Sequence, residues 1–481
     1  METILVGKEH WTGDFWMHSA VITELIDHPI HPSHPIIRSE VTHAFYSPYA
    51  LMVAMLAKVF AKDSIWALEV FALFNLLFFL FSFFSFCKVF FERRQNIIAA
   101  IGLALVLFFW GQDPPFWSGY FHIIVLNAVL PYPSTFAFSL ALFAIALYIS
   151  NRIRNFTFKS ALIILLTSVV ILTHTNTGIF LIIVLTLVNY SLKEMSLFKT
   201  VLYSGCMLFC SVALCLLWPY YNLIELVTGD IDDFNDQSYV LYERLAQQYW
   251  PSLLAVPIMI YKKGDKIIRF LSVGVFLMLG IVFSAYFAKF YGLSRLLFGV
   301  MFFSDLIIAY GITLFFNKES TMLKRYYTGL VFFAMVLCLF INRVYLRQVF
   351  RNLKNEKQID YCKKLDFIKE IVPPGETILS DVGTNNMIPT YGARVLATFY
   401  PVYWIQDIKS RRESVAVFFD PEKPNSLRLK ALLNYKPEYI LIDRSKFNFE
   451  ESTEMWLRSI SANTQKRGSM ELIKVNYNLF E

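Results

Sequence analysis

Long apolar segments alternate with short polar connections along most of the chain. Residues 66–91 read WALEVFALFNLLFFLFSFFSFCKVFF, which is longer than the about 20 residues that a helix needs to cross a bilayer. The pattern therefore predicts a mainly helical, polytopic membrane protein. We expect ten spans, some of them short enough to be tilted, broken or partly interfacial, at residues 66–90, 97–112, 133–150, 160–174, 178–191, 200–218, 251–262, 267–288, 294–316 and 326–343.

The basic residues of the connections predict how the spans are oriented. One alternate set of connections is rich in lysine and arginine, whereas the other set holds only Arg244 and Lys289. Basic connections stay in the cytoplasm by the positive-inside rule. We therefore predict three parts, which are an extracytoplasmic loop at 1–65, a transmembrane domain at 66–343 and an extracytoplasmic domain at 344–481.

If residues 1–65 are extracytoplasmic, some apolar segment must carry them across the membrane. Residues 1–65 contain neither a charged leader nor an apolar signal core, which are the marks of a secretory signal peptide. The tail could cross together with the first span, or a further apolar span could precede residue 1. We favour the second interpretation.

Composition excludes several classes of protein. Hydrophobic residues make up 56% of the chain, Phe alone contributes 47 residues, and the mean hydropathy is +0.49. The net charge of +7 is spread over the connections between spans, so nucleic acid is not an expected partner, whereas membrane lipids are. The six cysteines lie mostly in apolar segments without metal-ligand spacing, which indicates neither a disulfide framework nor a zinc site.

Two amphipathic helices are predicted in the first loop. Residues 14–26 carry apolar positions at helical spacing, with Thr12 as a candidate N-cap. Residues 45–60 predict a second interfacial helix that begins near Pro48. We expect both helices to lie along the membrane surface.

The first helix contains an acid in aromatic surroundings. The stretch HWTGDFWMHSA (10–20) places Asp14 among Trp11, Phe15 and Trp16, and we expect these rings to anchor the helix at the membrane interface. Asp14 and His18 are four residues apart and therefore share one face of a helix.

Three His-Pro pairs follow in DHPIHPSHPIIRSE (27–40). Such a density of histidine could form a metal site. Proline, however, favours an extended and irregular backbone, so we prefer a structural loop to metal ligation.

Several stretches resemble the GT-C glycosyltransferases. The layout is similar to that of the superfamily of protein mannosyltransferases and aminoarabinose transferases. The resemblance begins with an acid near the start of an outward first loop and with YSPY (46–49) at the start of a helix. It continues over nearly the whole chain in short motifs, which are LTHTNTG (172–178), LWPYYNL (217–223), YGLSRLL (291–297) and the tail IVPPGETILSDVGTNNMIPTYGARVLATFYP (371–401). GT-C enzymes differ in having a span before the acidic loop.

The resemblance implies a GT-C-like helical bundle with a small C-terminal α/β domain. It also implies a glycosyltransferase that moves a sugar from a polyprenyl-phosphate carrier to an acceptor outside the cytoplasm. Because the family's essential acid lies in the first loop, Asp14 is the candidate general base. The alternative is an acid that only interacts with the helix dipole.

Three residues are candidates for binding the carrier phosphate. Arg295 and Lys289 lie at the predicted outer ends of adjacent spans, where basic residues are few. A guanidinium can hold two phosphate oxygens at once, but either side chain could instead only reach lipid headgroups. His174 ends a short span at the same predicted face and could bind phosphate, orient Asp14 or simply cap the helix.

Further polar residues could line the substrate cavity. Asp113 and His122 flank PPFWSGYF, a stretch suited to stacking against sugars or to an interfacial aromatic belt. We add three residues of the first loop and first span, which are His18, Tyr46 and Glu69.

The tail predicts a small α/β domain. DYCKKLDFIKEI (360–371) is typical of a helix, whereas TILSD (377–381) and EYILID (438–443) are typical of strands bounded by turns. We expect this domain to bind the acceptor or to cover the cavity.

Two other classes of function remain open. A polymerase or ligase of lipid-linked glycans would use the same cationic groups to join whole glycans. A lipid or glycan flippase would share the spans, but the chain shows no internal repeat of the kind that transporters carry. The partners expected are a polyprenyl-phosphate-linked sugar and a glycan, lipid or protein acceptor at the inner or plasma membrane. The residues indicate no particular cofactor, and dependence on a divalent metal ion stays open.

Overall fold

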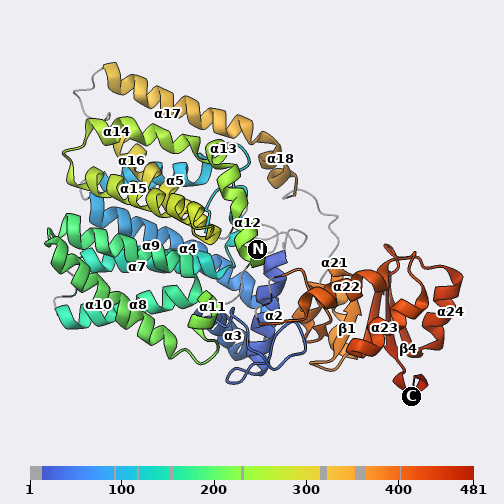
Figure 1. Cartoon of the computed structure of the whole chain (residues 1–481). Helices are drawn as coiled ribbons and strands as arrows, with labels where there is room; N and C mark the ends of the chain where they lie inside the picture. The colour runs from blue at the N-terminus through green and yellow to red at the C-terminus, as the bar shows by residue number, and fades with distance from the viewer. Residues whose placement is uncertain are drawn as a thin grey trace. The chain divides into compact units, whose positions relative to one another are not determined.

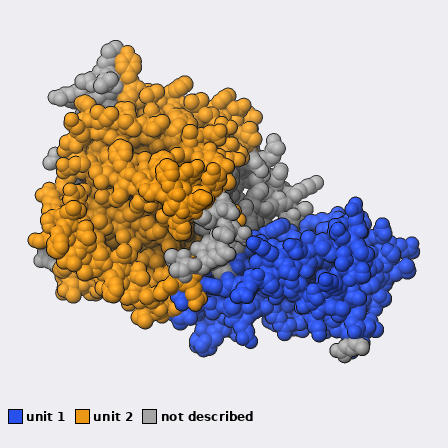
Figure 2. Space-filling view, viewed as in Figure 1, with its two compact units in different colours: residues 1–70, 219–222, 356–481 blue, residues 71–218, 223–355 orange. Residues whose placement is uncertain are grey.

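The computed structural model describes most of the chain, at residues 13–91, 94–115, 117, 119–150, 153, 155–228, 232–314, 322–352, 364–400, 402 and 404–480. Its contacts divide the chain into two compact units (Figures 1 and 2). Unit 1 consists of residues 1–70, 219–222 and 356–481, and unit 2 of residues 71–218 and 223–355.

Unit 2 is built from helices. They are α4 (Ser64–Phe91, which begins in unit 1), α5 (Gln95–Phe108), α6 (Leu126–Val129), α7 (Pro133–Ile149), α8 (Phe156–Thr173), α9 (Thr175–Leu187), η2 (Val188–Leu192), α10 (Leu197–Leu216), α11 (Leu223–Thr228), α12 (Asp232–Glu243), α13 (Leu245–Tyr249), η3 (Trp250–Ala255), α14 (Val256–Tyr261), α15 (Lys266–Phe287), η4 (Tyr291–Leu296), α16 (Leu297–Thr313), α17 (Met322–Ile341) and α18 (Arg343–Asn352).

The protein is a multi-pass membrane protein. By length and composition, six described helices can cross a membrane, at Ser64–Phe91, Phe156–Thr173, Thr175–Leu192, Leu197–Leu216, Lys266–Phe287 and Tyr291–Thr313. Three further predicted spans coincide with shorter apolar helices, at Gln95–Phe108, Pro133–Ile149 and Arg325–Ile341. That these shorter helices also cross the membrane stays a prediction.

One of the short predicted spans is broken. Residues 251–262 do not form one uninterrupted α-helix, because this stretch is divided between η3 and α14. Pro251 and Pro257 occupy the first turns of these two elements. Proline has no backbone N–H to donate to the preceding turn, so each one starts a new helical segment.

The helix α16 forms the centre of unit 2. It belongs to the apolar segment Tyr291–Thr313, and 89% of the most apolar 18 residues of this segment are buried. Two glycines allow α15 and α16 to approach closely. A Cβ atom at Gly274 would lie 2.5 Å from the ring of Phe303, and one at Gly299 would lie 2.6 Å from the sulfur of Met278. Small residues at such crossings are the usual means of packing helices within a membrane.

Unit 1 begins with the two predicted amphipathic helices, α2 (Gly13–Asp27) and α3 (Pro48–Val59). The α3 helix begins as its sequence indicates. The Ser47 hydroxyl accepts a hydrogen bond from the backbone N–H of Ala50 at 3.3 Å, and Pro48 occupies the first turn.

The C-terminal part of unit 1 is the predicted α/β domain. Its sheet has the order β2-β1-β3-β5-β4, in which β2, β1 and β3 are parallel and β5 runs antiparallel to β3 and β4. The predicted strands at 377–381 and 438–443 are confirmed as β1 and β3. The elements are α20 (Phe367–Ile371), β1 (Thr377–Ser380), α21 (Val382–Asn385), η6 (Ile388–Tyr391), β2 (Arg394–Val395), α22 (Ile408–Phe419), α23 (Asn425–Tyr435), β3 (Tyr439–Asp443), α24 (Glu451–Ser459), β4 (Ser461–Arg467), β5 (Met470–Val475) and η7 (Tyr477–Leu479).

The first loop is built into this α/β domain. The backbone N–H of Val395 donates to the carbonyl of Ile36 at 2.8 Å, so the loop is hydrogen-bonded to β2. The side chains of Glu24 in α2 and Arg394 in β2 form an ion pair, and both are more than nine-tenths buried. Segments more than 350 residues apart in sequence therefore form one compact body.

Candidate functional site

Arg295 is held in a fixed position in unit 2. It lies in η4, directly before the central helix α16, and only 8% of its surface is exposed. Its guanidinium carbon lies 4.5 Å from the centre of the Trp117 ring, an arrangement that attracts a cation to the face of an indole. A buried guanidinium that is stacked in this way is pre-organised to hold two oxygens of an anion such as phosphate.

Two buried tyrosines lie close to this cation. The hydroxyl of Tyr249 donates to the hydroxyl of Tyr120 at 3.0 Å. Burial raises the pKa of both phenols, while the charge of Arg295 acts on Tyr120 in the opposite direction. Both hydroxyls therefore stay protonated at neutral pH and can donate hydrogen bonds, a contribution that sequence reasoning missed.

His174 lies beside the same loop that carries Trp117. It occupies the junction between α8 and α9, and its Nδ1 atom lies 2.8 Å from the hydroxyl oxygen of Thr177. A Cβ atom at Gly119 would lie 3.9 Å from the His174 ring. Trp117 thus lies next to Arg295 and Gly119 next to His174, although these two candidates are far apart in sequence.

The two polar residues that flank this loop have structural partners. The Asp113 carboxylate accepts a hydrogen bond from the Tyr345 hydroxyl at 2.8 Å, and the Asp113 carbonyl accepts one from the Gln248 amide at 2.6 Å. His122 is 1% exposed, and its Nε2 atom lies 2.9 Å from the carbonyl of Pro115. Burial lowers the pKa of His122 to about 4, so its ring is neutral.

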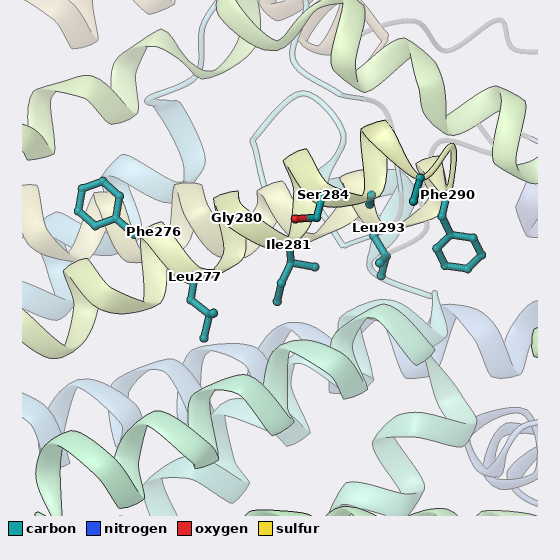
Figure 3. A pocket seen from close by; sticks show the side chains of 9 residues that line it. Phe276, Leu277, Gly280, Ile281, Ser284, Phe290 and Leu293 are labelled. Carbon is teal, nitrogen blue, oxygen red and sulfur yellow. The ribbon is translucent and has the colours of Figure 1, made fainter. Parts of the chain in front are cut away.

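Lys289 stands at the end of an open apolar groove of about 580 Å³. The groove follows α15, and Ser284 is the one lining residue with a polar side chain (Figure 3). Lys289 is exposed and lies between two lining residues, Ala288 and Phe290. The complete lining is Phe276, Leu277, Gly280, Ile281, Ser284, Ala285, Ala288, Phe290 and Leu293. No sequence pattern predicts this groove, because its residues look like any lipid-facing stretch.

The candidate base lies in unit 1. Asp14 is exposed in the first turn of α2. His18, one turn further on, is partly buried and stacks on Phe45 with ring centres 5.1 Å apart. Burial lowers the pKa of His18 to about 3, so it is a neutral neighbour of Asp14 and adds no positive charge to the helix face.

The aromatic residues around Asp14 do not serve as membrane anchors in the way expected. Phe15 is 1% exposed and Trp16 is 4% exposed. Both rings therefore pack inside the protein, because this face of α2 is covered by other parts of the chain. Trp11 lies outside the described residues.

Tyr46 and Glu69 are the remaining two candidates from the first loop and the first span. Tyr46 is buried, and its hydroxyl donates to the backbone carbonyl of Ser33, which ties the two halves of the loop together. Glu69 is partly buried in α4.

The histidine-rich loop is largely structural. His34 is fully buried, and its Nδ1 atom accepts hydrogen bonds from the backbone N–H groups of Ile36 and Ile37. Its ring packs edge-on against His43. Within the described ranges, no group of three or more His, Cys, Asp or Glu residues could hold a metal ion.

Comparisons with solved structures identify the fold. An oligosaccharyltransferase from Archaeoglobus fulgidus, with a tethered acceptor peptide that contains an NVT sequon, is 9% identical and has a TM-score of 0.53 over 89% of this chain and 65% of that chain. The same enzyme, AglB, with an inhibitory peptide and a dolichol-phosphate is 9% identical, with a TM-score of 0.50 over 90% and 65%. ArnT from Cupriavidus metallidurans bound to undecaprenyl phosphate is 10% identical, with a TM-score of 0.48 over 95% and 92%.

The chain thus has the fold of a membrane-embedded glycosyltransferase of the GT-C type, and the predicted fold class is confirmed. It spans slightly less than two thirds of the length of the AglB chain. No protein-family model matches the chain, and no curated protein sequence matches it.

Proposed function

We propose that the chain is a glycosyltransferase that moves a sugar from a polyprenyl-phosphate carrier to an acceptor on the extracytoplasmic face. One arrangement supports the proposal: two basic residues lie close in sequence to residues that line an apolar groove along α15. Lys289 lies between two groove residues, and the stacked Arg295 follows Leu293 of the lining after one residue. A ligand that fits both features has an anionic head and a long apolar tail.

The proposed reaction requires a base and a stabilised leaving group. The base takes the proton of an acceptor hydroxyl, whose oxygen attacks the anomeric carbon while the bond from this carbon to the phosphate oxygen breaks. The polyprenyl phosphate leaves with the electron pair, so cations must stabilise it. We assign the role of the base to Asp14, and the phosphate contacts to Arg295, Lys289 and His174.

The remaining candidates support this site in different ways. His18 shares the α2 face of Asp14, and Glu69 is the acid that lies near the start of α4. Tyr46, Asp113 and His122 act through the loops that they hold, because their polar atoms already contact the protein.

A second candidate function is favoured by the fold. AglB is an oligosaccharyltransferase, and its structures contain peptides and a dolichol-phosphate. Transfer of a whole glycan from a lipid carrier would use the same base and cations. The acceptor would then be a protein, whereas transfer of a single sugar also suits a glycan or a lipid.

The proposal is tested with the purified full chain and a panel of donors. Native mass spectrometry would show whether a polyprenyl-phosphate monosaccharide or a lipid-linked oligosaccharide binds. Release of the free carrier would then be measured in the presence of glycan, lipid or peptide acceptors. Transfer with and without EDTA would decide whether a divalent ion takes part, since one AglB structure contains zinc and sulfate. A chain that binds no carrier would refute the proposal.

Arg295→Lys is expected to weaken carrier binding about tenfold while the protein stays folded. Lysine keeps the positive charge but loses the planar fork and the stacking on Trp117. Carrier affinity measured by native mass spectrometry checks this expectation. Arg343→Lys is the matched control, because Arg343 also stacks on a ring, that of Phe340 at 4.2 Å, but is exposed. Equal carrier affinity of Arg295→Ala and the natural chain would show that Arg295 does not contact phosphate.

Labelling of introduced cysteines with an impermeant maleimide tests the proposed orientation. A cysteine at Asn463, which is exposed in β4, is expected to react from outside intact cells. A cysteine at Gly264 should be spared, although its added Cβ meets no atom within 4 Å. The reverse labelling pattern would overturn the orientation that the basic connections predict.

A further inference from the structure

Two lysines from different helices meet at one aromatic ring in unit 2. The Nζ atom of Lys193 lies 3.4 Å from the centre of the Tyr148 ring, and the Nζ atom of Lys159 lies 5.8 Å from the same centre. Two like charges over one ring repel each other, so this arrangement gains stability when an anion joins it. The connections that carry both lysines are on the side predicted to be cytoplasmic.

The ring that gathers the lysines is fixed by buried polar contacts. Tyr148 in α7 is 1% exposed, and its hydroxyl donates to the side-chain carbonyl of Asn189 at 2.5 Å. Asn189 is fully buried in the π-helical turn η2, and its amide donates to the hydroxyl of Ser204 in α10 at 3.4 Å. Lys193 follows η2 directly as its C-cap. The π-helical turn thus determines the position of Lys193. Such turns are often found at functional sites.

No carboxylate of the described residues pairs with either lysine. Lys159 donates to the carbonyl of Ser150 at the end of α7, at 2.6 Å. Glu194, the neighbour of Lys193 in sequence, pairs instead with Lys266 at 2.7 Å. Burial and the charge of Lys159 lower the pKa of Lys193 to about 8, so Lys193 is still mostly protonated at neutral pH. The site thus offers two positive charges to an external anion.

The surroundings of the two lysines are suited to lipid. The neighbouring helices α8 and α10 begin with strongly exposed rings, and Phe156, Phe158 and Phe198 are 61–76% exposed. These helices pack against each other in unit 2 (Figure 1). Large apolar side chains that are exposed on membrane helices are covered by the acyl chains of lipids. These surroundings favour an anion that carries acyl chains.

We propose that Lys159, Lys193 and Tyr148 form a binding site for the phosphate headgroup of an anionic membrane lipid. The two ammonium groups bind the phosphate oxygens, and the acyl chains lie along the exposed phenylalanine rings. Basic groups between the cytoplasmic ends of helices are the usual means of holding such headgroups. The site is separate from the proposed carrier site at Arg295 and does not depend on the transfer reaction.

The test measures lipid binding to the purified full chain. Delipidated protein is titrated with phosphatidylglycerol, with phosphatidylcholine and with inorganic phosphate, and bound species are counted by native mass spectrometry. Phosphatidylglycerol should bind preferentially, and Lys159→Gln/Lys193→Gln should weaken it about tenfold. The charge-conserving Lys159→Arg/Lys193→Arg should retain it.

The matched control removes two lysines elsewhere on the same predicted face. Lys262→Gln/Lys263→Gln makes the same change in charge, and Lys262 lies over the ring of its own neighbour Tyr261 at 5.0 Å. This control should bind phosphatidylglycerol as the natural chain does. Equal losses in the two glutamine pairs, equal binding of phosphatidylcholine, or displacement of the lipid by an equal concentration of inorganic phosphate would each overturn the proposal.

Discussion

The Asp14→Asn variant is expected to transfer sugar at least about 100-fold more slowly than the natural chain, the usual scale for losing a general base. Asparagine keeps the size of the side chain but cannot accept the proton of the acceptor. Binding of the lipid-linked donor should survive, because the proposed phosphate contacts belong to Arg295, Lys289 and His174. The measurement is the rate of release of free carrier together with donor affinity.

Asp27→Asn provides the control for this prediction. Asp27 ends the same helix and is also exposed, so its replacement makes the same chemical change away from the proposed site. We expect normal transfer from it. Normal transfer by Asp14→Asn would leave Asp14 as a helix-end acid that interacts with the dipole. The search for the base would then move to Asp113 or to the acids of the 230–233 stretch.

Arg394→Ala is expected to release the first loop from the α/β domain. The change leaves Glu24 as a buried charge without its ionic partner, which typically costs about 3–5 kcal/mol. Amide exchange over residues 13–47 should therefore accelerate by more than about 100-fold, since 1.4 kcal/mol corresponds to a factor of ten. Hydrogen-exchange mass spectrometry of the full chain measures this change.

Arg38→Ala is the matched control for Arg394→Ala. Arg38 lies in the same loop and pairs with Glu438 of the same domain at 2.5 Å, but 66% of its side chain is exposed. Exposed pairs contribute little, typically less than about 1 kcal/mol, so exchange should change only slightly. Equal exchange in the two alanine variants would show that the buried pair does not hold the loop.

The buried pair also makes a pH-dependent contribution to the stability of unit 1. Burial alone would raise the pKa of Glu24, but the charge of Arg394 and hydrogen bonds from Arg394 and Ser33 outweigh it, and the pKa lies below its ordinary value of 4.5. Because the folded state favours the ionised form, this contribution is present above pH 4.5 and is lost as the pH falls through the folded value.

The sequence by itself determined the local elements. Continuous apolar runs predicted the long spans, because a bilayer offers the backbone no hydrogen-bond partners and a helix satisfies its backbone groups within one segment. Ser47 and Pro48 marked the start of α3, and apolar runs bounded by turns marked β1 and β3. These features depend on neighbours within a few residues, and the structure agrees with them.

Only the tertiary structure decided which of these elements meet. Glu24 and Arg394 are 370 residues apart, and Trp117 comes long before Arg295 in sequence, so no local pattern pairs them. The one available sign was a charged residue beside apolar ones, in TELI (23–26) for Glu24 and in ARVLA (393–397) for Arg394. Such a sign indicates a buried partner without naming it.

The aromatic residues around Asp14 show the same limit. A membrane interface and a protein interior both favour large rings, so the sequence could not tell an anchor at the membrane surface from a core residue. Phe15 and Trp16 are buried in the protein, because the fold supplies neighbours that cover them. The amino-acid composition determines which side chains avoid water. Packing between distant parts of the chain determines whether lipid or protein surrounds these side chains.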